Sequence, residues 1–213
     1  LNGSAGQSLG AFLSKSISLK IFGDANDYVA KGLSGGKIVV IPSKTNRLKT
    51  KENTIIGNTV LYGATSGTLF AAGKAGERFA VRNSGGNAIV EGCDSNGCEY
   101  MTGGNIVILG SIGDNFGAGM TGGMAFIYDP ENTFENFVNP ASVTWQKPET
   151  KYWKEKLKSL IQDHLKETNS AIAKEILDDF ENKINNFKQV CPVEMLDKLE
   201  NPITLKGKIS KAV

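Results

Sequence analysis

Cys93 and Cys98 form the one closely spaced pair of thiols in the chain. Four residues, 94–97, separate them, and neither a second thiol pair nor a nearby histidine accompanies them. A structural zinc site needs four ligands, usually in two such pairs. We therefore expect both side chains to pack as small residues at neighbouring corners of the fold. A regulatory disulfide between them stays open as an alternative.

His164 is the only histidine. A Ser-His-Asp or Cys-His nucleophile would have to use it, because these mechanisms need an imidazole as the general base. It lies one heptad after Leu157 on the apolar face of an expected helix, which favours a packed, hydrogen-bonded structural histidine. Cys191, next to Pro192, is expected at a helix cap rather than as a nucleophile.

Carboxylates are scattered through the glycine-rich part of the chain, residues 1–129. Glycosidases pair two carboxylates across the scissile bond, and sugar-binding sites add aromatic platforms. Asp24 and Asp27 are close in sequence, but few aromatic residues surround them. We expect loop or corner positions for the acidic side chains of this part, which are Asp24, Asp27, Glu52, Glu77, Glu91, Asp94, Glu99 and Asp114.

Residues 117–122 match the dinucleotide-binding pattern GxGxxG. That fingerprint follows a strand and opens a helix, because the helix N-terminus holds the pyrophosphate. Here a strand-like run, Met124 to Tyr128, follows the glycines instead, so we interpret them as corner residues. We predict no catalytic, cofactor-binding or metal-binding residue in this chain.

A short phrase recurs along the glycine-rich part: a Ser or Thr, one further residue, a Gly and then an apolar run. The last four of these glycines are spaced 19, 18 and 19 residues apart. Such a period is typical of a solenoid, and it is too short for a strand plus a crossover helix. The anchor glycines are Gly10, Gly36, Gly67, Gly86, Gly104 and Gly123.

Aligning the phrases on these glycines produces apolar columns. Positions +2 and +4 share one face of a strand and are expected to face the interior. The +3 column (Leu13, Val39, Phe70, Ile89, Val107, Phe126) is apolar too, and should face outward. Because monomers rarely expose such a patch, the C-terminal tail or another domain should cover it. The fold class predicted is mainly β: a right-handed parallel β-helix of six to seven rungs, each rung being one complete coil, followed by a helical tail.

The distribution of glycine and proline divides the chain. Of 25 glycines, 24 lie at or before Gly123, whereas five of the six prolines lie at or after Pro130. We predict a β-helix over 1–129, an irregular connector over 130–148 and a helical tail over 149–213 that packs on the solenoid or on neighbouring domains. Within the tail, apolar spacing predicts helices over 149–167 and, after an N-cap at Asn169–Ser170, to about 187, and a third helix begins at Pro192.

Composition excludes several classes of partner. The net charge is only +2 and evenly spread, so no basic patch argues for nucleic acid, and no apolar run is long enough for a membrane. Three cysteines without a signal peptide favour a reducing, cytosol-like compartment. The chain opens with Leu1 rather than Met, so we expect a piece of a longer polypeptide.

Three segments identify a family resemblance: residues 1–8, residues 23–36 and residues 92–104 are similar to the C-terminal GXGXG domain of the glutamate synthase large subunit. The tail agrees with it at His164, Thr168, Ser170, Ile176, Leu177, Val190 and Pro192. The resemblance covers essentially the whole chain. One departure lies at 94–96, where the family often has a Gly-Asp-His-like run.

The resemblance implies a part of an enzyme that makes two glutamates from glutamine and 2-oxoglutarate with NAD(P)H or ferredoxin. It implies two partners: an amidotransferase domain, and a barrel domain that carries FMN and an iron–sulfur cluster. The GXGXG domain itself is implied to be structural and cytoplasmic, with no cofactor of its own.

Two other classes stay open as alternatives. One is the GXGXG component of another redox complex, such as formylmethanofuran dehydrogenase, which is not expected to carry the helical tail. The other is an autonomous β-helix enzyme or binding module, against which the missing acid pair and aromatic platform count.

Overall fold

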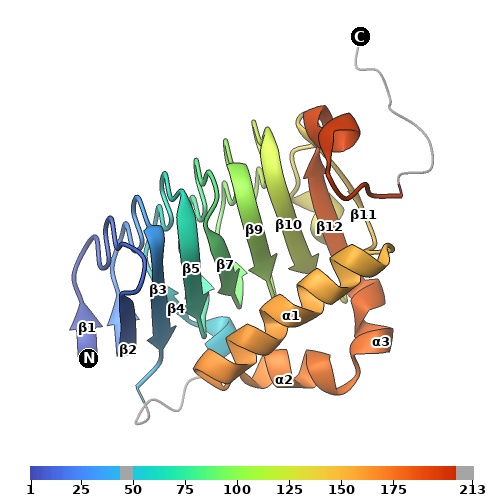
Figure 1. The fold of residues 1–213 in the computed structure, drawn as a ribbon. Coiled ribbons are helices and arrows are strands. Elements are labelled where there is room, and N and C mark those ends of the chain that lie inside the picture. Colours follow the sequence, from blue (N-terminus) through green and yellow to red (C-terminus); the bar gives the residue numbers. More distant parts are fainter. Residues whose placement is uncertain (44–49, 205–213) are drawn as a thin grey trace.

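The computed structural model describes residues 1–43 and 50–204. The chain forms a β-solenoid of about six turns, with helices packed against it near the C-terminus (Figure 1). The fold class predicted from the repeats is therefore confirmed. None of the described helices is long and apolar enough to cross a membrane.

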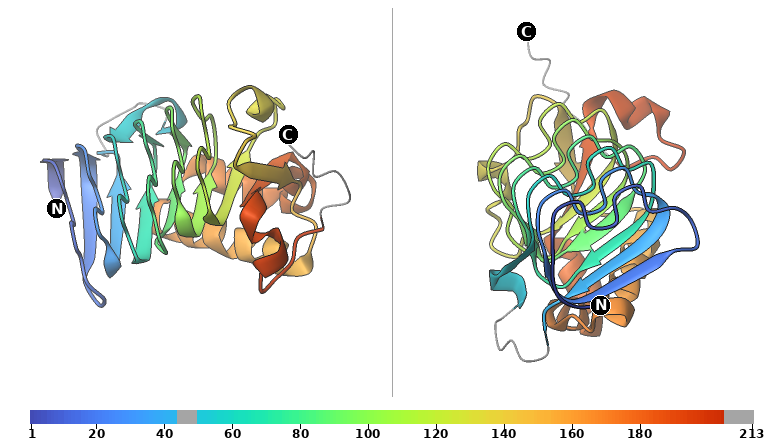
Figure 2. Two further views of the ribbon diagram at one scale, coloured as in Figure 1. Left: turned by 90° about the horizontal axis from the view of Figure 1, so that it is seen from above. Right: turned by 90° about the vertical axis from the view of Figure 1, so that its left-hand side faces the viewer.

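One sheet carries most of the strands, and its central members run parallel. They follow one another in the order β2 (Ser18–Ala25), β3 (Ser34–Ile41), β5 (Ser66–Ala71), β7 (Asn87–Val90), β9 (Thr102–Ile108) and β10 (Gly122–Tyr128). Shorter strands form the opposite wall: β1 (Asn2–Ala5) beside the end of β2, then β4 (Thr54–Ile56), β6 (Lys74–Ala75) and β8 (Gly92–Cys93). Successive rungs stack along one axis (Figure 2).

The pairing registers of the parallel strands confirm the repeat period predicted from the sequence. Ile38 pairs with Leu69, Leu69 with Ala88, and Ala88 with Ile106, so equivalent residues stand 31, 19 and 18 positions apart. From the second anchor glycine onward, the +2 and +4 columns are buried inside the solenoid, as predicted. They comprise Ile38, Val40, Leu69, Ala71, Ala88, Val90, Ile106, Ile108, Ala125 and Ile127.

The predicted alignment of the first repeat is wrong. Leu19, not Phe12, pairs with Ile38, which makes the first gap 19 residues as well. Phe12 is 68% exposed and Ser14 is exposed, while Leu13 packs against the solenoid interior instead of joining the outward column. The phrase around Gly10 lies within a corner, and β2 starts only at Ser18.

The corners have an unusual backbone: three alternate residues of each take positive φ. In the second rung these are Tyr28, Ala30 and Gly32, at 61°, 59° and 61°. Their N–H groups donate alternately, Tyr28 to Asn58 O and Gly32 to Tyr62 O in the next rung, and Ala30 to Leu9 O in the previous one. A left-handed residue with a side chain costs about 1–2 kcal/mol. Inter-rung hydrogen bonds and burial of the middle side chain offset that cost.

The tail contains more β-structure than predicted. After η2 (Phe134–Asn136), strand β11 (Val143–Gln146) lies inside the segment expected to be an irregular connector. β12 (Phe187–Pro192) pairs antiparallel with both β10 and β11 and so extends the main sheet. Pairing with an existing sheet edge overrides the weak local pattern of these segments. The division at 129/130 and 148/149 stays a prediction.

Helices fill the rest of the tail: α1 (Lys151–Thr168), α2 (Ala171–Asp178), α3 (Phe180–Lys183), η3 (Ile184–Asn186) and η4 (Val193–Lys198). The second helix ends earlier than expected and restarts as α3, and Phe187 lies in a strand. The predicted third helix is the 3₁₀ segment η4, with Pro192 before it. Cys191 lies in β12, so its predicted cap position is wrong.

The outward apolar column is covered by the tail. Helix α1 crosses β3, β5, β7 and β9 and is followed by α2 and α3 below it (Figure 1). Val39, Phe70, Ile89, Val107 and Phe126 form a second core with residues of these helices, among them Trp153, Leu157, Leu160, Ile161 and Ile176. The inference that this flank must be covered is confirmed, and the cover belongs to the same chain.

Candidate functional site: a buried Glu-Ser-His contact beside an acidic cavity

Glu91 stands where the repeat calls for an apolar side chain. It directly follows β7, at the position five residues after the anchor glycine. The equivalent residues of the other rungs are Ile41, Ala72, Leu109 and Tyr128. These positions face the helical tail, and Glu91 is completely buried there. A buried carboxylate is expensive unless polar partners compensate it.

The helices supply those partners. Ser170, the N-cap of α2, donates from Oγ to Glu91 Oε1 at 2.5 Å and accepts from Ala173 N at 3.3 Å. His164, near the C-terminal end of α1, places Nε2 3.9 Å from the same Oε1. Its ring stacks on Phe70 with centroids 6.1 Å apart. Residues more than seventy positions apart in sequence thus meet at one carboxylate.

The pKa shifts follow from burial and from these contacts. Burial raises the pKa of Glu91, but His164, Ser170 and Thr50 together outweigh it and hold the pKa below its ordinary 4.5. Burial lowers the pKa of His164 below 6.5, despite the opposing influence of Glu91. At neutral pH the carboxylate is therefore charged and the imidazole is neutral.

This arrangement does not form a nucleophile. The Ser170 hydroxyl donates directly to the carboxylate, and its side chain is 3% exposed, so a substrate carbonyl cannot reach it. His164 is packed as the sequence indicates, but its contact with Glu91 is longer than a hydrogen bond. The three side chains instead join the solenoid to its helical tail.

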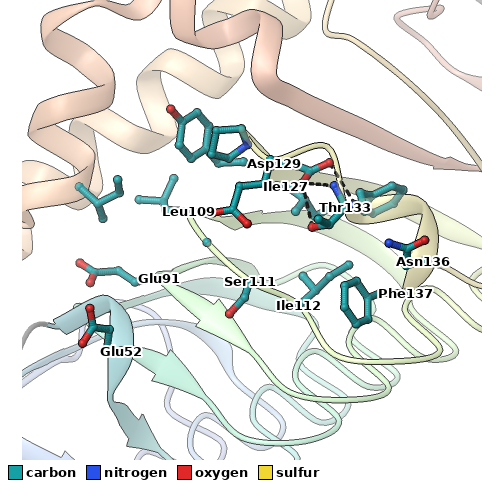
Figure 3. A pocket seen from close by; sticks show the side chains of 16 residues that line it. Glu52, Glu91, Leu109, Ser111, Ile112, Ile127, Asp129, Thr133, Asn136 and Phe137 are labelled. Carbon is teal, nitrogen blue, oxygen red and sulfur yellow. Dashed lines mark hydrogen bonds between the residues drawn. The ribbon is translucent and has the colours of Figure 1, made fainter.

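A cavity of about 560 Å³ lies beside this contact (Figure 3). Apolar side chains form most of its wall, from the ends of β9 and β10, from η2 and from the start of α2: Leu109, Ile112, Ile127, Tyr128, Phe134, Phe137 and Ile172. Glu52 and Glu91 lie at one end, and in this view the Glu52 carboxylate points toward Glu91. The cavity therefore combines a long apolar wall with two acidic residues at one end.

A third carboxylate of the cavity is already engaged. Asp129 accepts from the backbone N–H groups of Thr133 and Phe134, at 2.9 and 3.1 Å, and lies 3.9 Å from Lys188 Nζ. It shapes the loop that leaves β10. After Tyr128 the described chain continues into η2 and forms no further short strand beside residues 109–112. These residues therefore line the cavity.

The cysteines are packed in cores. Cys93 and Cys98 lie in the solenoid interior, and both are free thiols. Burial raises the pKa of Cys93 to about 12 and that of Cys98 well above 9. Cys191, buried against the helices, also has its pKa raised by burial to about 12. Such thiols are poor nucleophiles and poor ligands, because both roles need the thiolate.

The remaining candidates occupy corners and strands. Gly117 and Gly119 have φ of 73° and 64° within a corner, and Gly122 opens strand β10 rather than a helix. Asp27 lies at a corner, where its Oδ1 accepts from Asn58 N at 2.8 Å, whereas Asp24 is an exposed residue of β2. Among residues 1–43 and 50–204, no group of three or more His, Cys, Asp or Glu could hold a metal ion.

A model of the GXGXG motif family matches residues 1–193. The chain belongs to the GXGXG family. The matched range includes α1 to α3 and β12, so the GXGXG unit comprises most of the helical tail as well as the solenoid.

Relatives of this GXGXG chain are much longer proteins. It is 59% identical over 210 residues to a glutamate synthase [NADPH] large chain of Azospirillum brasilense, a match that covers 99% of this chain and 14% of the relative. It is 50% identical to a glutamate synthase [NADH] of Schizosaccharomyces pombe, over 96% of this chain and 10% of the relative. A ferredoxin-dependent glutamate synthase 2 of Synechocystis is 48% identical, over 93% of this chain and 13% of the relative.

Sequence reasoning did not identify the Glu91 contact. It placed Glu91 among loop or corner carboxylates, and it recognised Ser170 only as an N-cap, which it is. A signal was present: from the second anchor glycine onward, Glu91 is the charged member of an otherwise apolar +5 column. Extending the alignment by that position would have indicated a buried carboxylate that needs partners.

Proposed function

We propose that this chain is the GXGXG domain of a glutamate synthase and that its role is structural. In this proposal it holds the amidotransferase domain and the FMN and iron–sulfur domain in place while they convert glutamine and 2-oxoglutarate into two glutamates. The observation that carries the proposal is the 59% identity over 99% of the chain to a segment of such an enzyme.

The hydrogen bonding between the rungs supports a role for the solenoid as a spacer between other domains. Each rung is bonded to its neighbours through both walls and through the corners, so the solenoid cannot shorten without breaking many hydrogen bonds at once. Its apolar flank is already occupied by α1 and α2. Neighbouring domains must therefore use other faces.

The corner face offers such a surface. It lies along the upper edge of the solenoid in Figure 1, away from α1 and α2. Phe12, Tyr28, Tyr62 and Tyr100 are exposed on it, by 68%, 38%, 37% and 49%. The guanidinium of Arg82 lies 5.5 Å from the Tyr100 ring centroid. Aromatic residues and arginine are enriched at protein interfaces.

The iron–sulfur cluster of the proposed parent enzyme does not fit the cysteines of this chain. Cluster ligation needs accessible thiolates in a group, whereas Cys93, Cys98 and Cys191 are buried thiols in two different cores. We place FMN, the cluster and the NAD(P)H or ferredoxin site on the other domains. The relatives named for NADPH, NADH and ferredoxin are 59%, 50% and 48% identical to this chain, which fits a domain that does not select the reductant.

The test measures the two partial reactions, glutamine hydrolysis and ammonia-dependent amination, separately from the coupled glutamine-dependent reaction. The chain alone should show no glutamine-dependent amination of 2-oxoglutarate. In the complete enzyme, a Tyr100→Asp change should lower glutamine-dependent turnover and leave ammonia-dependent amination and glutamine hydrolysis nearly intact. Lys158→Ala, on the helical side, serves as the control. Turnover by the isolated chain, or equal loss of all three activities in correctly folded Tyr100→Asp enzyme, would overturn the proposal.

A further inference from the structure

The third positive-φ residue of each corner belongs to a column on the corner face, with one member in each successive rung. The N–H of Gly32, for example, donates to Tyr62 O, directly before Gly63 in the next rung. Glycine, which adds no side chain to the surface, recurs in this column. Its members are Phe12, Gly32, Gly63, Arg82, Tyr100 and Gly119.

Aromatic rings of the chain itself cover two of these glycines. A Cβ on Gly32 would lie 2.5 Å from the Phe12 ring, and a Cβ on Gly119 would lie 2.4 Å from the Tyr100 ring. A ring thus lies directly over each of them, and both rings belong to the previous rung. Gly63 has no such cover, because the previous member of its column is Gly32. A Cβ on Gly63 would meet nothing within 4 Å.

The backbone of Gly63 also differs from that of the other members of the column. Its N–H donates to no acceptor in the described part of the chain. The other five N–H groups donate to Lys31 O, Tyr62 O, Glu99 O, Ala118 O and Ser142 Oγ. Gly63 is only half-buried, so an acceptor from another polypeptide segment can reach this donor.

The charge around Gly63 is positive. The charged residues in the corner of Gly63 and in the corners of the two adjacent rungs are all basic: Lys31, Arg78 and Arg82. Arg78 pairs with Glu99 of a further rung at 3.3 Å. Among the described residues, no carboxylate lies within ion-pair distance of Lys31 or Arg82. The surface therefore complements an aromatic ring, which a cation attracts, and a carboxylate beside it.

We propose that a neighbouring domain of the complete enzyme places an aromatic side chain over Gly63, with an acidic residue beside it that faces Lys31 and Arg82. The ring lies on Gly63 as the Phe12 ring lies on Gly32, and an oxygen of the same segment accepts from the Gly63 N–H. This inference rests on the proposed scaffold role, since it names the chemistry of the segment that the corner face receives.

Hydrogen–deuterium exchange at the Gly63 amide tests whether the position is covered. The exchange is followed by mass spectrometry in the isolated chain and in the complete enzyme. We expect at least roughly 10-fold slower exchange in the complete enzyme, because the contact must open before the amide meets solvent. The amides of α1 serve as the internal control, since their hydrogen bonds are the same in both states.

A photo-cross-linker identifies the occupant. Tyr62, which is 37% exposed and adjacent to Gly63, is replaced by p-benzoylphenylalanine in the complete enzyme, and the cross-linked peptide is sequenced. We expect a segment of another domain that contains an aromatic residue flanked by an acidic one. The same replacement at Tyr152 of α1, which is 44% exposed, is the matched control for unspecific cross-linking.

Gly63→Asn tests the open space itself. Asn tolerates positive φ, so the corner keeps its backbone, but the new side chain takes the place of the ring. The variant should lose the Tyr62 cross-link to the aromatic segment. Equal exchange of the Gly63 amide in both states, a cross-linked segment without an aromatic residue, or an unchanged cross-link in Gly63→Asn would overturn this inference. The proposed function depends instead on the activities of the Tyr100→Asp enzyme, so the two failures are distinguishable.

Discussion

The molecule contains two apolar cores that are built differently. The solenoid interior consists of repeated columns, and each residue contacts its counterpart one rung away. The second core joins the outer face of the sheet to α1, α2 and α3, segments far apart in sequence. Among the described residues, the buried Glu91 and His164 lie at the second core. Inside the solenoid, the buried Asn83 is satisfied by backbone atoms of its own rung and of the next rung, whereas Glu91 takes its side-chain partners from a segment that does not repeat.

The largest loss of stability in the solenoid interior is expected from a side chain at an anchor glycine near the start of a strand. Gly104 has φ of 89°, and an added Cβ would lie 2.1 Å from Gly86 O in the previous rung. We expect Gly104→Val to destabilise the protein by at least about 3 kcal/mol or to prevent folding, because backbone atoms of the stack would have to separate. Urea unfolding followed by circular dichroism measures the change.

Gly63→Ala is the matched control for that experiment. Gly63 also has positive φ, at 64°, but a Cβ there would meet nothing within 4 Å. We expect a loss of only about 1–2 kcal/mol, from backbone strain alone. Equal losses for Gly104→Val and Gly63→Ala would show that rung spacing does not limit stability.

The second core is tested at Leu157, a fully buried residue of α1. Leu157→Ala should cost about 2–5 kcal/mol, because it leaves a cavity between the helix and the sheet. Ser159→Ala, on the exposed side of α1, should change stability by less than about 0.5 kcal/mol. Limited proteolysis shows which core fails first: release of the tail before cleavage of the solenoid supports two separable cores, and simultaneous loss argues against them.

The buried contact makes the second core sensitive to acid. The folded-state pKa of His164 is lowered, so the unfolded chain binds the proton more readily, and the stability contributed by the neutral ring is lost as pH falls below about 6.5. Glu91 changes stability in the same direction at lower pH: because its folded-state pKa is lowered from 4.5, the stability that the carboxylate contributes is lost as pH falls below that value. Urea midpoints should fall from pH 7 to pH 5 in the native chain. His164→Phe should show a shallower fall, and identical slopes would contradict this assignment.

The smallest expected effect concerns the thiols, which lie in both cores. With their pKa values raised by burial, Cys93, Cys98 and Cys191 should react with an aromatic disulfide reagent at least roughly 100-fold more slowly in the folded than in the unfolded chain. Adding reductant should leave the unfolding midpoint unchanged. Rapid native-state labelling of Cys93 or Cys98 would reopen the redox alternative.

The repeat alignment determined much of this structure in advance. The parallel β-helix, the inward columns and the need to cover Val39, Phe70 and their counterparts followed from the repeat, because a strand has only two faces. Helical spacing separately predicted a helix over 149–167, and α1 is that helix. Ser170 was recognisable as an N-cap from its residue type and place. These features depend on neighbours in sequence or on an exact repeat.

Tertiary structure alone decided the rest. The alternating positive φ at Arg78, Ala80 and Arg82 cannot be predicted from the residue types, because hydrogen bonds to adjacent rungs impose this conformation. Strand β12 forms because the edge of β10 offers unpaired backbone groups, and β11 in turn pairs with β12. Glu91, Ser170 and His164 meet because α1 folds back across the sheet. Local sequence cannot encode such contacts, because each depends on where a distant segment comes to lie.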